Sequence, residues 1–166
     1  MPESAAEPWT DTEAGTEAVL ARLSRVRFSV TTGHAGIVLA GVQAHRSGSA
    51  VVIEEKGRTT VRGRSIATWN MARWSRRGHA IELEHLRFGP ERPVFLARLT
   101  LGAEGFWQAH RPHLCGQDRY TPDLRLADGS IVIRWRITGP DGEQFIQTVY
   151  SDEPAAPPSP PATPHP

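Results

Sequence analysis

The chain has 166 residues, with 19 lysine and arginine side chains, 18 aspartate and glutamate side chains and a formal net charge of +1. This length fits one domain, and the balanced charge argues against a dedicated nucleic-acid-binding protein, which usually carries a marked basic excess. A single cysteine excludes an internal disulfide framework. No stretch approaches the roughly 20 apolar residues that span a bilayer, and Met1 to Trp9 has no apolar run of a signal peptide. We therefore expect a soluble, cytoplasmic protein with no nucleic-acid or membrane partner.

Both ends of the chain are predicted to lie outside the folded part. We expect residues 1–10 to form a flexible N-terminus, residues 11–151 a single domain and residues 152–166 a disordered tail. The prediction for the tail rests on composition, because the segment from Glu153 to Pro166 holds seven of the 14 prolines and cannot build a core.

One helix is predicted, over residues 11–24. Polar residues at positions 10–12 can cap its first turn, and Val19, Leu20 and Leu23 form a short apolar stripe on one side. The rest of the chain has a different pattern.

From Val26 onward, apolar and polar residues alternate with a period of two, interrupted by turn residues, and this pattern predicts strands. Some of the candidate segments must merge, which leaves about eight to ten strands. The candidates are Val26–Thr32, Gly36–Ala44, Ala50–Glu55, Arg58–Arg64, Ile66–Arg73, Gly78–Leu86, Val94–Leu101, Gly105–Ala109, His113–Tyr120, Leu124–Leu126, Ile131–Thr138 and Gln144–Tyr150.

The connections between these strands are short, which favours antiparallel neighbours in a meander. The expected turns include Ser75-Arg76-Arg77 and Gly139-Pro140-Asp141-Gly142. Most of the predicted strands have one apolar face. A long antiparallel sheet buries such a face by closing into a barrel or by folding into a sandwich. The fold we predict is an all-β, antiparallel up-and-down barrel with one N-terminal helix. A barrel of about eight strands can enclose one small ligand.

Three short elements support this fold by resemblance. They are Ile53-x-Glu55-x-Gly57, His113-x-Cys115-x-x-Asp118-x-Tyr120, and Trp135-x-Ile137-x-Gly139-Pro140 leading to Tyr150. On these elements, over the segment from Val51 to Tyr150, the chain resembles a bacterial family of lipocalin-like (calycin-type) domains of unassigned function. The resemblance implies a small up-and-down calycin-type barrel with a ligand-sized interior, and it implies no activity.

The second of these elements gathers the densest set of groups able to move protons. On an unbroken strand, His113 and Cys115 would face one way and Asp118 and Tyr120 the other. We predict a bulge or break at Gly116–Gln117 that turns all four side chains inward. Asp118 would then orient His113, and Tyr120 would donate a proton or a hydrogen bond. A purely structural network that fixes strand register is the competing interpretation.

Further candidate ligand-binding residues come from the alternation of faces. His79 and His85 lie on the apolar side of their strand and are expected to line the interior or to be satisfied core histidines. Glu55 is expected to face inward and to need an arginine or histidine partner, either beside a ligand or in an ion pair at the barrel mouth. The tryptophans are expected to fill the core or to form an aromatic wall. Those singled out are Trp69, Trp74, Trp107 and Trp135.

The sequence leaves several functions open. We expect the protein to bind a small, largely apolar or aromatic molecule in the barrel, without a cofactor. One alternative is a cofactor-free enzyme of the cyclase, isomerase or dehydratase type that uses His113, Asp118 and Tyr120 as acid and base. Another is a metal site around His110, His113 and Cys115, although zinc sites usually use paired ligands from two segments. The last alternative is a protein-binding module whose barrel interior is filled with side chains. The sequence does not decide the oligomeric state.

Overall fold

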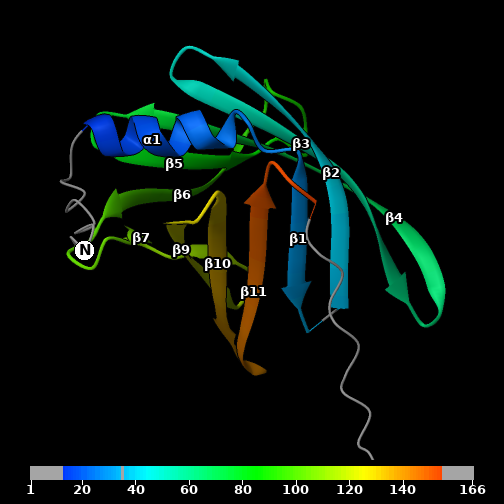
Figure 1. Ribbon diagram of the computed structural model, residues 1–166. Coiled ribbons are helices and arrows are strands. Elements are labelled where there is room, and N and C mark those ends of the chain that lie inside the picture. The colour runs from blue at the N-terminus through cyan, green and yellow to red at the C-terminus, as the bar shows by residue number, and fades with distance from the viewer. Residues whose placement is uncertain (1–12, 35, 155–166) are drawn as a thin grey trace, which may run out of the picture.

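The computed structural model describes residues 13–34 and 36–154, so the predicted flexible N-terminus and nearly all of the proline-rich tail lie outside the described residues. The described part has one helix, α1 (Glu13–Leu23), followed only by strands (Figure 1). None of its helices is long and apolar enough to cross a membrane. The strands are β1 (Phe28–Gly33), β2 (Gly36–Ser47), β3 (Ala50–Val61), β4 (Arg64–Arg77), β5 (Ala80–His85), β6 (Val94–Leu101), β7 (Trp107–Ala109), β8 (His113–Cys115), β9 (Asp118–Ala127), β10 (Ser130–Gly139) and β11 (Gly142–Ser151).

The strands form one antiparallel barrel of ten strands. The order runs β10-β11-β1-β2-β3-β4-β5-β6-β7-β9, and the pairing of β9 with β10 closes the ring. Closure leaves no free edge around the ring, because each strand is hydrogen-bonded on both sides. The predicted all-β, up-and-down barrel with one N-terminal helix is confirmed.

The short strand β8 pairs only with β9, and together with β7 it occupies one position in the barrel wall. Gln108 of β7 lies opposite Asp123, whereas His113 of β8 lies opposite Tyr120. The β7–β8 side therefore has two more residues between these pairs than the β9 side. Pro122 lies in this interval and has no N–H to donate, which is typical of a site where a ladder is interrupted.

Helix α1 closes one end of the barrel (Figure 1). Arg22 Nη1 ties the helix to the β9–β10 turn by donating a 2.7 Å hydrogen bond to the carbonyl of Ala127. The core lies between the helix and the strand ends on this side, where full burial of aliphatic and aromatic side chains supplies most of the driving force for folding. Its residues include Val19, Leu20, Leu23, Val51, Ile81, Leu99, Trp107, Leu124 and Ile131.

One predicted turn was wrong, and an expected merger of two candidate strands is present. Ser75, Arg76 and Arg77 belong to β4, and the turn comes later, at Gly78 and His79. The segments Ala50–Glu55 and Arg58–Arg64 form one strand as far as Val61, because the pairing with β2 and β4 continues past Glu55. The sequence did not indicate which candidates would merge, since the apolar alternation stops at Glu55. Long strands whose ends extend past the core have no apolar pattern to reveal them.

The predicted interruption at Gly116–Gln117 is present, and it is a tight reverse turn between β8 and β9. Gly116 has φ 63°, in the left-handed region that two-residue hairpin turns need. Because directly paired residues share a face of a sheet, the turn places His113 beside Tyr120 and Cys115 beside Asp118. The four side chains lie on one face because they pair across a hairpin. The sequence predicted the same result from a bulge within a single strand.

Candidate functional site

The half of the barrel that lies away from helix α1 is hollow. It encloses a cavity of about 480 Å³ with a mostly apolar wall, a size common for small-molecule sites. Every strand of the barrel except β7 contributes residues to the wall, and β8 contributes residues as well. Its residues are Thr31, Val38, Ala40, Glu55, Thr68, Trp69, Asn70, Ala72, Trp74, Leu83, His85, Leu96, His113, Cys115, Tyr120, Ile133, Trp135, Ile146, Thr148 and Tyr150.

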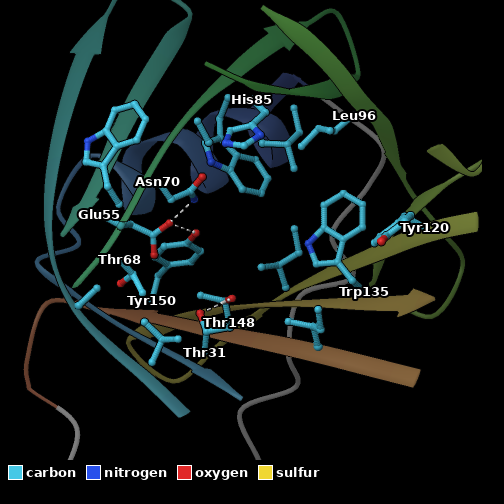
Figure 2. A pocket seen from close by; sticks show the side chains of 18 of the residues that line it. Thr31, Glu55, Thr68, Asn70, His85, Leu96, Tyr120, Trp135, Thr148 and Tyr150 are labelled. Atoms are coloured by element: carbon cyan, nitrogen blue, oxygen red, sulfur yellow. Dashed lines mark hydrogen bonds between the residues drawn. The ribbon is translucent and has the colours of Figure 1, made fainter. Parts of the chain in front are cut away.

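A buried carboxylate is the polar centre of one wall (Figure 2). Glu55 is only 8% exposed, and it accepts hydrogen bonds from three side chains on three other strands. Ser29 Oγ donates to Oε1 over 2.6 Å, whereas Asn70 Nδ2 and the Tyr150 hydroxyl donate to Oε2 over 2.7 and 3.2 Å. A buried polar group is tolerated only when such partners replace water, so this network holds Glu55 in place.

All three partners of Glu55 are neutral donors. The arginine or histidine partner that the sequence suggested is absent among the described residues, and Glu55 forms neither that pair nor an ion pair at the mouth. Burial, together with the charge of Glu55 and the hydrogen bond to it, raises the pKa of Tyr150 well above its usual value. Tyr150 therefore stays protonated and remains a donor at physiological pH.

Asn70 continues a row of inward-facing residues along β4 that reaches toward the helix. Ala72 and Trp74 follow at alternate positions, and His85 lies opposite Ala72 on β5. Burial lowers the pKa of His85, and the charge of Arg87 adds to this effect, so its imidazole is neutral near pH 7. Trp74 is 1% exposed, and its Nε1 has no hydrogen-bond partner among the described residues.

The opposite wall carries an aromatic group, in which Tyr120 and Trp135 are visible in Figure 2. The rings of His113 and Tyr120 meet edge to face with centroids 6.4 Å apart, and those of Tyr120 and Trp135 do so at 6.5 Å. Edge-to-face pairs of this kind favour one ring orientation over others. The β8–β9 hairpin therefore supplies an ordered aromatic wall.

Asp118 does not complete this group in the way the sequence suggested. It lies against Gly139 of β10, where a methyl group in place of the glycine hydrogen would overlap Asp118 Oδ1. It is absent from the cavity wall, and no hydrogen bond joins it to His113 among the described residues. Cys115, its cross-strand neighbour, does border the cavity and is exposed. The role of His113, Asp118 and Tyr120 as an acid–base set stays a prediction.

The remaining candidate residues divide between the cavity, the surface and the core. Trp135 lines the cavity, and Trp69 borders it, but Trp69 lies opposite Lys56 on the outer face and its Nε1 donates to Glu54. His79 is exposed in the turn after β4, and Trp107 is buried in the core near helix α1, so neither reaches the cavity.

The residues of the metal hypothesis are not gathered into a site. His110 lies in the connection between β7 and β8 and is hydrogen-bonded to Thr100. Residues 13–34 and 36–154 contain no group of three or more histidine, cysteine, aspartate or glutamate side chains placed to hold one metal ion.

Sequence reasoning missed Ser29, Asn70 and the pair formed by Thr31 and Thr148, whose hydroxyl groups are 2.8 Å apart. In β1 the polar residues Ser29 and Thr31 face inward, so alternation does not identify the buried face of this strand. A signal was present in Asn70, since an amide within a strand-forming run suggests a buried hydrogen bond. Its partner could not be named without the register that sets Asn70 opposite Glu55.

Comparison with known proteins gives a family and no activity. A family model described as "Family of unknown function (DUF6314)" matches residues 21–152, which include all of the cavity wall. No curated protein and no solved structure matches the chain.

Proposed function

Because the chain belongs to the DUF6314 family, whose function is unknown, we propose a function from the barrel itself: it binds a small, largely apolar or aromatic molecule in the barrel cavity. The observation that carries this proposal is the cavity of about 480 Å³, whose mostly apolar wall includes a few fixed polar groups. An apolar wall favours burial of an apolar ligand, and the fixed polar groups orient it. We also propose that the barrel is of the lipocalin-like type, which rests on the resemblance of the short sequence elements given above.

A neutral fluorescent probe tests this function directly. N-phenyl-1-naphthylamine should bind one molecule per chain with a rise in fluorescence, because transfer from water to the cavity dehydrates its rings. Ala40→Trp should abolish this rise, since Ala40 lines the cavity on β2. Ala67→Trp is the matched control, because Ala67 is exposed and absent from the cavity wall.

Two results would contradict the proposal. One is the absence of saturable binding to the folded wild-type protein. The other is equal loss of binding in the two tryptophan variants, because the site would then not be the cavity. Native mass spectrometry of the purified protein gives an independent measurement, with a bound mass expected for wild type and lost in Ala40→Trp.

A second candidate function is a cofactor-free acid–base enzyme in the same cavity. The observation that favours it is the contact between the rings of His113 and Tyr120 on the cavity wall, together with a neutral imidazole at His85. A neutral imidazole can accept a proton and a phenol can donate one. Conversion of a captured ligand by wild type, lost in His113→Gln without loss of ligand binding, would support this function over simple binding.

A further inference from the structure

The cavity that we propose to bind a small molecule contains one acidic side chain and no strongly basic one. Among the residues that the structure describes, Glu55 is the only aspartate or glutamate in the cavity wall. None of the 19 lysine and arginine side chains lies in the wall formed by the described residues, although these residues occur from Arg22 to Arg136. Its two histidines are His85, which is neutral near pH 7, and His113. The interior therefore offers negative charge without a matching cation.

The Glu55 carboxylate also retains capacity to accept another hydrogen bond. Each carboxylate oxygen can accept about two hydrogen bonds. Oε2 of Glu55 receives two, from Asn70 and Tyr150, whereas Oε1 receives one, from Ser29. Oε1 therefore has one acceptor position that no described side chain uses.

The rest of the wall suits a positively charged group on an apolar body. Tyr120, Trp135, Trp74 and Tyr150 surround the same space, and the faces of aromatic rings attract organic ammonium groups. A bound carboxylate would lie near Glu55 with no arginine or lysine to neutralise it, and like charges repel strongly at low dielectric.

We infer that the ligand of this barrel is an organic amine with an apolar or aromatic body, whose ammonium group binds Glu55 Oε1. This inference rests on the proposed function and narrows it to one ligand class. Glu55 is then the residue that determines specificity, and Ser29, Asn70 and Tyr150 are the positioning residues that hold its carboxylate toward the cavity.

Three probes with the same naphthyl body test the charge preference on the wild-type protein. They are 2-(2-naphthyl)ethylamine, 2-(2-naphthyl)ethanol and 2-naphthylacetate, with dissociation constants measured by isothermal titration calorimetry at pH 7. We expect the amine to bind at least tenfold more tightly than the carboxylate, with the alcohol between them. A smaller ratio, or tighter binding of the carboxylate, overturns the inference. It leaves the proposed function intact, which fails if no probe binds, including the neutral fluorescent one, or if the two tryptophan variants lose binding equally.

Glu55→Gln tests whether this carboxylate is the cause. The amine-to-carboxylate ratio should fall to within threefold of unity, because the variant removes the charge and keeps the shape of the side chain. Glu54→Gln is the matched control and should keep the wild-type ratio, since Glu54 is bonded to Trp69 and Lys56 on the outer face. An unchanged ratio in folded Glu55→Gln would assign the preference to another group and overturn the inference.

Glu55→Gln can fail to fold, because its amide adds a donor beside three others. Thr68→Lys then decides the question, since it adds a positive charge to the cavity wall and leaves the bonds of Glu55 in place. It should reduce amine binding relative to the alcohol by at least tenfold. Unchanged selectivity in that folded variant would show that charge in the cavity does not govern binding.

Discussion

Tyr150 donates a hydrogen bond to Glu55 Oε2 over 3.2 Å, which joins strands β11 and β3 across 95 positions of the chain. Both residues are buried, and Asn70 donates to the same oxygen from β4. The barrel thus closes around a carboxylate whose partners come from distant segments. In a low-dielectric interior, such a network fixes one arrangement of strands, because any shift of register would leave donors unpaired.

Removal of the carboxylate should destabilise the protein more than removal of one donor. Tyr150→Phe takes away one bond to a charged acceptor and should lower the free energy of unfolding by about 1–2 kcal/mol. Glu55→Ala leaves Ser29, Asn70 and Tyr150 without their shared acceptor and should cost at least about 3 kcal/mol. Urea unfolding followed by circular dichroism measures both. Equal losses in the two variants would contradict the network as described.

His85 should make the protein less stable in acid. Burial lowers its pKa in the folded state below the usual 6.5, so the unfolded chain binds a proton at a higher pH than the folded one. Stability is therefore lost as the pH falls through 6.5, and the loss levels off below the folded-state pKa. Between pH 8 and pH 5 the melting temperature of wild type should fall further than that of His85→Gln. Parallel curves for the two proteins would show that His85 titrates normally.

The turn between β8 and β9 depends on the left-handed backbone at Gly116, with φ 63°. Gly116→Val should cost about 1–2 kcal/mol, because a β-branched side chain crowds the carbonyl in this conformation. Gly116→Asn should cost much less, since asparagine tolerates the same region. If the hairpin positions the aromatic wall, Gly116→Val should also weaken probe binding. Comparable stabilities for the two variants would argue against a strained turn at this position.

Gly139 and Asp118 should behave as a coupled pair. A methyl group at position 139 would overlap the Asp118 carboxylate, so Gly139→Ala should force that carboxylate into another position at a cost of about 1 kcal/mol. In an Asp118→Ala background the same change should be nearly neutral, and the double-mutant cycle should give a coupling energy of about 1 kcal/mol or more. Thermal unfolding of the four proteins supplies the data. Additive losses would show that the two residues do not touch.

Much of the fold was readable because alternation is a local property. In β10, Ile131, Ile133, Trp135 and Ile137 stand at alternate positions, and the three isoleucines are buried in the barrel. The glycine at 116 likewise marked a break whose position was correct. In a strand whose outer face is also apolar, alternation does not show which face is buried. Val30 faces outward in β1, and its polar neighbours Ser29 and Thr31 face the interior.

The candidate site was predicted only in part, for the same reason. Glu55, His85 and Trp135 were named in advance, and each lies in the cavity wall. Trp107 and His79 were named with equal reason and lie elsewhere, because face alone does not say at which level of the barrel a residue sits. That level is set by strand register and by the helix that fills one end.

The sequence by itself determined that this chain is an all-β protein with one helix, since period-two alternation and short turns favour an antiparallel meander that has to bury one face. Closure into a barrel depends on the long-range pairing of β9 with β10. Only the tertiary structure decided that Glu55 has three neutral donors and no cation. Those donors lie on β1, β4 and β11, and their meeting at one point depends on long-range strand register, which no local pattern encodes.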